Sequence, residues 1–448
     1  MWMDKLRAVL RNQTLMEVVS NINWLMIDRV ARIIIGLLIN AWVRRYLGPE
    51  EIGKWDFALA LASIYSIIAA LGLDNIIIRD IINHPSRTLT ILGTSLRIRL
   101  WSGLCLALVS ILSMVLFMQH NTEGLLLMAI ASSLIVVNAT ESIVAYNNSQ
   151  LKSKYTVIAK GIPFFLFAGI KVILILNELP LIAFVLAYVG ELIIAGLLLL
   201  LIFHRKVDSV FRLKNSNTIG RMMLRHSWPL MVSGLAYMVY MRIDQVMLGN
   251  MLTTKEVGVY STAIKLFEVP MSILTILSST FFPKLTAFYK KDETLFFDNY
   301  KRIVNLMTFL AYGGLLLTFV SSHFIVHSLY GEAYADAAPI LIILTTGIIF
   351  MFNGGFRGTY LTIRNKQGII LVMAILAASI NISLNYFFIR KWGLLGAAIA
   401  SACTQLIMTQ FANLLYSETR TLLKIQLRGL FLLDIIPTIR FFLNQKKG

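Results

Sequence analysis

Charged residues are scarce in this sequence of 448 residues, and acidic residues are scarcer than basic ones. Charged residues make up 14% of the chain, whereas soluble domains contain about 25%. Hydrophobic residues make up 57%, and the mean hydropathy is +0.74. This composition excludes an ordinary soluble domain, so we predict an integral membrane protein.

Cysteine is nearly absent, and so are the short motifs of common enzymes. Cys105 and Cys403 lie within apolar runs, which is typical of small core residues and not of a disulfide or metal site. The sequence contains no Walker A, HExxH, CxxC or dinucleotide-binding GxGxxG motif. We therefore predict a protein that is not an enzyme and has no cofactor or metal. Its energy would come from an H⁺ or Na⁺ gradient, or from consumption of its product.

The few charges are strongly biased toward one sign. Lys and Arg number 41 and Asp and Glu 23, so the net charge is +18. In a soluble protein this excess would indicate nucleic-acid binding, but no basic patch here belongs to a soluble fold. The other use of Lys and Arg is to set membrane topology. We therefore expect membrane lipid, and no nucleic acid, around this chain.

The sequence contains many long apolar runs. A bilayer core about 30 Å thick requires about 20 apolar residues per helix, and twelve runs of this kind predict an all-α protein with two bundles of six transmembrane helices. The first bundle, residues 24–203, has spans at 24–43, 56–78, 98–118, 124–146, 156–176 and 181–203. The second bundle, residues 228–416, has spans at 228–249, 258–281, 303–325, 337–356, 368–389 and 394–416.

Three further segments flank these bundles. Residues 1–23 predict a cytoplasmic or interfacial lead-in without a cleavage site, and residues 204–227 predict a basic cytoplasmic linker. In the last segment, residues 417–448, Asp434, Pro437 and Arg440 interrupt a short apolar run. This pattern favours a basic interfacial tail over the alternative, a thirteenth spanning helix.

Loop charges predict the orientation. Lys and Arg outside the spans concentrate at both ends of the chain, in the central linker and in alternate loops. The opposite loops hold only Arg44, Arg45, Lys54, Lys255, Arg390 and Lys391. The positive-inside rule then places both termini in the cytoplasm of a cell whose inner membrane the chain crosses many times.

One stretch of the sequence, residues 44–79, predicts a tight Gly48–Pro49 turn followed by a long apolar helix, and it occurs twice. A shift of 205 positions brings it onto the segment that begins near Leu252. The identical pairs include Glu51 and Glu256, Gly53 and Gly258, Ala58 and Ala263, Leu61 and Leu266, Ile68 and Ile273, Arg97 and Arg302, and Ile98 and Ile303. A repeat with an even number of crossings predicts parallel halves with a cavity between them.

The repeated turns are candidate gating elements. Glu51 and Glu256 are expected at the periplasmic starts of the second and eighth spans, where a carboxylate favours the positive end of a helix. Gly53 and Gly258 are expected to let the chain turn closely at these starts, and bulky substitutions there are expected to hinder closure of the outer gate.

Charges inside the spans are the candidate functional residues, because a charge facing lipid costs about 2.5 to 3.5 kcal/mol. The acids Asp56 and Asp74 and the base Lys171 lie near predicted span ends, where ion pairing or snorkelling is the simpler interpretation. The candidate substrate-binding cations are Arg29, Arg32, Arg242 and Lys265. The candidate counter-charges or ion-coupling acids are Asp28, Glu141, Glu191, Asp244 and Glu268.

Spacing indicates that some of these charges pair. Asp28 and Arg32 are four residues apart, and Lys265 and Glu268 are three apart, so each pair shares a helix face. Satisfied ion pairs between helices are the alternative to a cavity-lining role. An excess of cations in a dry cavity suits an anionic head group such as a diphosphate.

The stretch YLGPEEIGKWDFALALASIYSIIAALGLDNIIIRDI resembles the N-terminal segment of the polysaccharide-biosynthesis flippases, the O-antigen type of bacterial envelopes. The span count and the basic loops are similar too. The resemblance implies the multidrug/oligosaccharidyl-lipid/polysaccharide exporter fold, with the first, second, seventh and eighth spans lining a cavity. It implies a cargo of undecaprenyl-diphosphate-linked oligosaccharide for lipopolysaccharide-type polymers. This cargo moves from the cytoplasmic to the periplasmic leaflet by alternating access, with a polysaccharide polymerase and a chain-length regulator as partners.

Two other functions are weighed against this one. An O-antigen polymerase needs a substantial periplasmic loop, whereas the predicted outer loops are short. A multidrug or cation antiporter of the same fold is expected to have a compact acidic site, whereas this chain mixes cations with acids.

Overall fold

The computed structural model describes residues 13–117 and 122–444. It divides into two compact units: the first contains the chain up to Leu47 and Lys54–Met238, and the second contains Gly48–Gly53 and Val239–Gly448. The boundary between Met238 and Val239 falls inside one long helix, α9 (Asn217–Met251). The units are described separately below.

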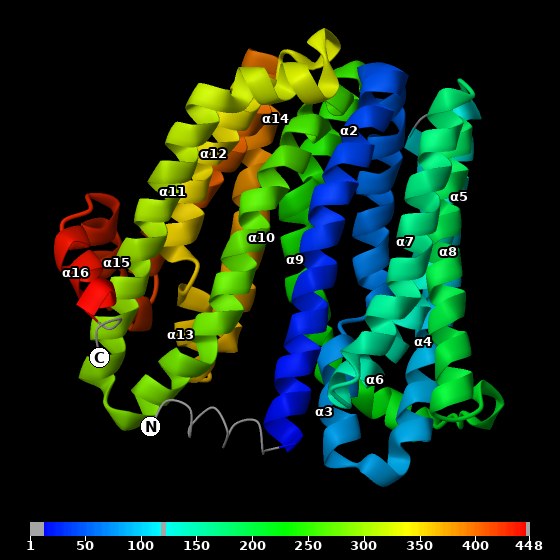
Figure 1. Ribbon diagram of the computed structural model, residues 1–448, viewed down its shortest axis with the longest axis horizontal. Coiled ribbons are helices and arrows are strands. Elements are labelled where there is room, and N and C mark those ends of the chain that lie inside the picture. Colours follow the sequence, from blue (N-terminus) through cyan, green and yellow to red (C-terminus); the bar gives the residue numbers. More distant parts are fainter. Residues whose placement is uncertain (1–12, 118–121, 445–448) are drawn as a thin grey trace. The chain divides into compact units, whose positions relative to one another are not determined.

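The first unit is a helical bundle (Figure 1). It contains most of α2 (Gln13–Ala70), then α3 (Asp74–Asn83), α4 (Thr88–Phe117), α5 (Thr122–Val137), α6 (Glu141–Ser149), α7 (Ser153–Leu176), α8 (Leu181–Lys206) and the start of α9. Helix α2 is broken at Gly48, whose φ of 79° is accessible to glycine, and Pro49 begins the next helix with the φ that a first turn needs. The predicted Gly48–Pro49 turn is therefore present.

Two predicted spans of this unit are interrupted. The span predicted at 56–78 ends at Ala70, because Leu71 and Gly72 take positive φ values of 55° and 63°, and α3 then starts afresh. The span predicted at 124–146 is divided by a 3₁₀ turn, Asn138–Thr140, between α5 and α6. Both predicted spans lie within candidate membrane segments, but neither is one uninterrupted helix, since apolar composition continues across turns that the backbone makes.

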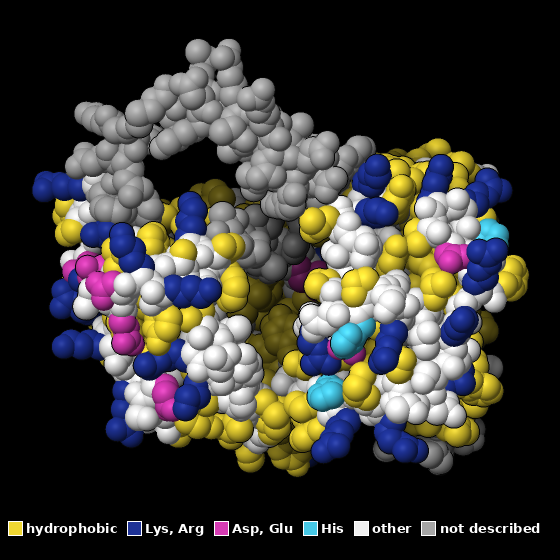
Figure 2. All heavy atoms as spheres, turned by 90° about the horizontal axis from the view of Figure 1, so that it is seen from below, with side chains coloured by type: hydrophobic (Ala, Val, Ile, Leu, Met, Phe, Trp, Pro, Cys, Tyr) yellow, Lys and Arg dark blue, Asp and Glu magenta, His cyan; other side chains and the backbone are white. Residues whose placement is uncertain are grey.

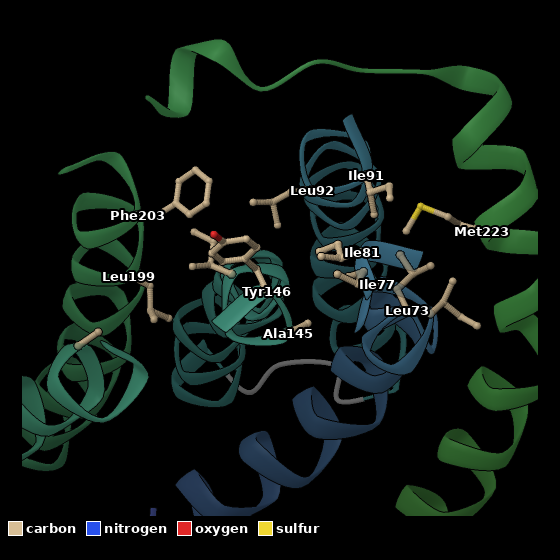
Figure 3. Close-up of a cluster of buried hydrophobic side chains, with 13 residues drawn as sticks. Leu73, Ile77, Ile81, Ile91, Leu92, Ala145, Tyr146, Leu199, Phe203 and Met223 are labelled. Carbon is tan, nitrogen blue, oxygen red and sulfur yellow. The ribbon is translucent and has the colours of Figure 1, made fainter. Parts of the chain in front are cut away.

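A cluster of buried apolar side chains joins α3, α4, α6, α8 and α9 (Figure 3). Leu73, just before α3, and Ile77 of α3 are fully buried in it, and Tyr146 of α6 meets Phe203 of α8 edge to face with ring centroids 5.4 Å apart. In membrane segments such clusters stabilise helix packing through van der Waals contacts between the side chains. The cluster therefore fixes the short helices α3 and α6 against the longer ones.

The second unit is also helical throughout its described part. It contains α10 (Thr254–Lys291), α11 (Glu293–Tyr330), α12 (Ala337–Gly354), α13 (Arg357–Ile363), α14 (Gln367–Thr409), α15 (Ser417–Leu430) and α16 (Ile435–Asn444). Helix α14 is broken at Gly393, between the two spans predicted at 368–389 and 394–416. Thr253 and Glu256 form a capping box at the start of α10, with the Glu256 carboxylate accepting from the Thr253 amide at 2.7 Å.

Nine segments of the described chain are long and apolar enough to cross a membrane. Two of them, Ile34–Asn83 and Gln367–Leu414, each contain two of the predicted spans, so the nine cover eleven of the twelve predictions. The remaining prediction, 228–249, lies in α9, whose charges Arg242 and Asp244 make it more polar. The chain is thus a multi-pass helical membrane protein.

Basic side chains gather at one end of the helices. Figure 2 shows the face toward which α3 and α6 lie, and Lys and Arg outnumber Asp and Glu on it. This distribution is what the positive-inside rule expects of a cytoplasmic face.

Candidate functional site

The first unit contains a cavity of about 370 Å³. Helices α2, α7 and α8 and the turn before α6 surround it. Its polar and charged lining consists of Arg32, Ser63, Ser66, Asn138, Thr140, Glu141, Lys160, Tyr188 and Glu191. A cavity of this size with convergent polar groups is typical of a ligand site.

Ion pairs organise the charges of this cavity. Lys160 Nζ lies 2.6 Å from Glu141 Oε1, and both side chains remain about one-third exposed at 33% and 37%. Lys171 Nζ lies 2.8 Å from Glu191 Oε2 and is more enclosed. The Arg32 guanidinium lies 5.2 Å from the centre of the Phe164 ring.

Two of the lysines of α7, Lys160 and Lys171, lie on one face of the helix. Lys160, Phe164 and Lys171 are spaced four and seven residues apart, which places them on the same side of the helix. The cavity lining contains two cations, Arg32 and Lys160, and two carboxylates, Glu141 and Glu191. Lys171 is not part of the lining and pairs with Glu191.

The second unit brings together three of the predicted site residues. Glu268 on α10 accepts from Arg242 Nη2 on α9 at 3.2 Å and from Lys265 Nζ at 3.2 Å. The pairing of Lys265 with Glu268 is the one that their spacing predicts. Two cations share one carboxylate, and the Glu268 side chain is 42% exposed. The cluster is accessible and has a surplus of one positive charge.

The internal sequence repeat aligns one residue of the cluster in the second unit with one residue of the cavity in the first unit. A shift of 205 positions places Glu268 on Ser63, which lines the cavity of the first unit. The same face of the same repeated helix thus carries polar ligand groups in both halves. A structural repeat would produce this correspondence.

Asp244 forms a separate, buried polar cluster. It is 4% exposed, and its carboxylate accepts hydrogen bonds from Tyr260 Oη at 2.7 Å, Asn385 Nδ2 at 2.6 Å and Ser401 Oγ. Within the described ranges, no Lys or Arg forms an ion pair with it. The Asn385 Oδ1 atom beside it accepts no hydrogen bond. A carboxylate stabilised only by neutral donors is suited to holding a proton or a small cation.

The repeated turns contact each other. A Cβ atom on Gly53 would overlap the carbonyl oxygen of Thr254, and a Cβ atom on Gly258 would overlap the carbonyl oxygen of Pro49. Pro49 and Thr254 are themselves 205 positions apart, so the contact is reciprocal. Glu51 and Glu256, two residues before these glycines, therefore lie at the same end of the second unit.

The other predicted charges are placed as follows. Asp56 forms a buried ion pair with Arg44 at 2.8 Å, and Asp74 pairs with Arg99 at 2.8 Å, so both stabilise helix packing and neither lines the cavity. The side chains of Asp28 and Arg29 lie outside the described part of the structure. The expected pairing of Asp28 with Arg32 therefore stays a prediction.

Sequence reasoning missed two groups of residues. Lys160 lies in a predicted span, eleven residues before Lys171, and its charge was the signal that could have identified it. Asn381 and Asn385 are polar residues four apart in an otherwise apolar run, which places them on one buried helix face. Their position beside Asp244 depends on packing between distant helices.

The helical bundles and their charged interior sites define a membrane-transporter fold. The structure resembles that of the lipid II flippase MurJ in an inward closed conformation, with a TM-score of 0.69 and 16% sequence identity over 92% of each chain. At this identity the likeness shows the fold alone.

The family follows from the sequence match. The family model described as "Polysaccharide biosynthesis protein" matches residues 43–339, and the chain belongs to this family. Among its relatives, the capsular polysaccharide biosynthesis protein CapF of Staphylococcus aureus is 21% identical, over 87% of this chain and 96% of the relative. A putative O-antigen transporter of Shigella flexneri is 24% identical, over 90% of this chain and 98% of the relative. The resemblance found in the repeated segment is confirmed at the level of the family.

Proposed function

We propose that this protein is a flippase that moves an undecaprenyl-diphosphate-linked oligosaccharide from the cytoplasmic to the periplasmic leaflet of the inner membrane. Both termini would lie in the cytoplasm. The names of the relatives support transport in polysaccharide biosynthesis, and the basic face in Figure 2 supports the orientation. A polymerase and a chain-length regulator would act after it on the same lipid-linked unit.

The observation that carries this proposal is the surplus of one positive charge at an accessible ion-pair cluster of the second unit. In the second unit, Arg242 and Lys265 share the single carboxylate of Glu268. A diphosphate could accept hydrogen bonds from both cations in place of that carboxylate, at little cost in unpaired charge. In the first unit, Lys160 and Glu141 offer donors and acceptors to sugar hydroxyls and acidic sugars. A cation antiporter would need the opposite surplus.

Transport would proceed by alternating access, with the glycan and diphosphate in polar interior sites and the polyprenyl chain in lipid. Glu268 would re-form its two ion pairs when the cargo leaves, which leaves the empty cluster with one uncompensated positive charge instead of two. Asp244 would take a proton or Na⁺ in one conformational state and release it in the other, since burial makes its ionised form costly without a cation. The sequence offers no nucleotide-binding motif to supply another energy source.

The cation cluster is tested by charge-removing and charge-conserving substitutions. Arg242→Ala and Lys265→Ala should each lower transport at least tenfold, because one cation and the carboxylate then cancel. Arg242→Lys should retain most of the activity. Glu268→Gln should strengthen retention of an anionic cargo and slow its release, because both cations are then uncompensated. The measurement is transport of lipid-linked oligosaccharide into vesicles at matched protein level.

Lys290→Gln provides the control, since Lys290 is exposed at the end of α10 and far along the helix from Lys265. Full activity of Arg29→Ala, Arg32→Ala, Arg242→Ala and Lys265→Ala, singly and combined, would reject a cationic binding site.

A further inference from the structure

The C-terminal segment of the described chain forms a helical hairpin against α11. Helices α15 and α16, residues 417–444, are joined by a short turn, and Figure 1 shows them beside α11. We refer to these residues as the C-terminal hairpin. It belongs wholly to the second unit.

Polar contacts hold one side of α15 in the bundle. Thr419, Leu422, Gln426 and Gly429 are buried, at intervals of three and four residues. The Gln426 side chain accepts from Asn413 Nδ2 at 2.6 Å, and its backbone carbonyl accepts from Asn353 Nδ2 at 3.0 Å. A Cβ atom on Gly429 would lie 3.1 Å from Val304 of α11. The hairpin is therefore an integral part of the unit and has a fixed orientation.

The hairpin extends from the end of the bundle at which α11 and α14 begin toward the middle of α11. At its start, Glu418 pairs with Lys366, which precedes α14. At the other end of α15, the Leu430 carbonyl accepts from Tyr312 Oη at 3.0 Å. Val304 and Tyr312 lie in the membrane segment of α11. The turn of the hairpin thus lies farther along the candidate membrane segment of α11 than the start of the hairpin does.

The exposed side of the hairpin changes character along this direction. Arg420 and Lys424 are exposed one turn apart near the start of α15. Near the turn, Phe431, Leu433 and Ile436 are 74%, 62% and 63% exposed. Arg420 and Phe431 are separated by about 16 Å, at 1.5 Å per residue. Apolar side chains so exposed need a cover other than water.

The one acidic residue near the turn is compensated. Asp434 Oδ1 lies 3.0 Å from Lys301 Nζ, and its carboxylate accepts two hydrogen bonds from the Arg428 guanidinium at 2.9 and 3.0 Å. The Arg428 hydrogen bonds, together with Lys301, hold the pKa of Asp434 below its usual range. The group of three charges has a surplus of one positive charge, so the whole exposed side favours anions.

We propose that the C-terminal hairpin binds anionic phospholipid of the bilayer leaflet at this end of the bundle. Arg420 and Lys424 contact the phosphate groups, and Phe431, Leu433 and Ile436 pack among the acyl chains. The sequence of basic and then apolar side chains matches a phospholipid from head group to tail. A soluble protein partner would leave the apolar part at membrane depth without a function. The proposal depends on the membrane location of the chain and is independent of its cargo.

The proposal is tested on the full-length purified protein in detergent, titrated with phosphatidylglycerol or phosphatidylcholine while thermal unfolding is recorded. Phosphatidylglycerol should raise the unfolding temperature more than phosphatidylcholine does. In the variant Arg420→Gln/Lys424→Gln, the apparent affinity for phosphatidylglycerol should fall about 30-fold, since each basic side chain near an anionic surface contributes about fivefold. The variant Lys290→Gln/Lys291→Gln removes the same charge from the exposed end of α10 and should bind like the unmodified protein.

A second measurement tests whether the apolar side chains near the turn of the hairpin lie among the acyl chains. In a protein without Cys105 and Cys403, a fluorophore on a cysteine at position 433 should be quenched by spin-labelled acyl chains, and one at position 421 much less. Equal effects of the two lipids, or equal loss of affinity in both double variants, would overturn the proposal. Quenching at position 433 no stronger than at 421 would also overturn it, because the turn would then lie outside the lipid.

Discussion

Replacing Gly258 with alanine is expected to destabilise the protein by about 1 to 3 kcal/mol or more, the cost of overpacking a site that cannot relax. The added methyl group would overlap the carbonyl oxygen of Pro49, and a backbone oxygen cannot move aside as a flexible side chain can. Gly53→Ala should cost about as much, because it overlaps the equivalent oxygen of Thr254. Thermal unfolding in detergent at one fixed heating rate measures both effects.

The double variant distinguishes a single reciprocal contact from two independent ones. Because Gly53 and Gly258 contribute to one contact, the combined loss should be clearly smaller than the sum of the single losses. Gly313→Ala is the matched control, since Gly313 is a helical glycine with no heavy atom within 4 Å of the added methyl group. It should be neutral or slightly stabilising. Additive losses at positions 53 and 258 would contradict the reciprocal contact.

Replacing Asp244 with asparagine is expected to abolish the response of transport to an ion gradient and to lower its rate at least tenfold. Asparagine keeps the size of the side chain but cannot take up and release a proton, and it attracts a cation far less strongly. Three neutral donors, from Tyr260, Asn385 and Ser401, surround this carboxylate. Transport measured in vesicles with imposed H⁺ or Na⁺ gradients identifies the ion as well.

Ser401→Ala is the matched control for this prediction. It removes one of the three donors and retains the carboxylate, so it should reduce transport only modestly. An Asp244→Asn protein that still responds to either gradient would exclude this residue from coupling. The cause would then have to be sought at Glu141 or Glu191 in the cavity of the first unit.

Local sequence signals predicted the helices well. The break at Gly48 and Pro49, the capping residue Glu256 and the pairing of Lys265 with Glu268 all depend on residues close together in the chain. The period and length of the apolar runs predicted the membrane segments for the same reason. The turn at Leu71 and Gly72 was missed, because apolar residues continue on both sides of it.

Contacts between distant helices could not be predicted in this way. Asp244 meets Asn385 and Ser401 across more than 140 residues of sequence, and no local pattern indicates which helices pack together. Lys160 and Glu141 likewise belong to different helices. The internal repeat was the exception, since equal spacing along the chain predicted that Gly53 and Gly258 occupy related places.

The central claim is tested most directly by locating the lipid-linked oligosaccharide in the host membrane. In a strain lacking this protein, complete undecaprenyl-diphosphate-linked units should accumulate and stay inaccessible to a glycan-cleaving enzyme added outside spheroplasts. The unmodified protein should restore access, and the variant Arg242→Ala/Lys265→Ala should not. Complete units that are already accessible in the deletion strain, or short unpolymerised chains already transferred to lipid A, would contradict the proposal that this protein is the flippase.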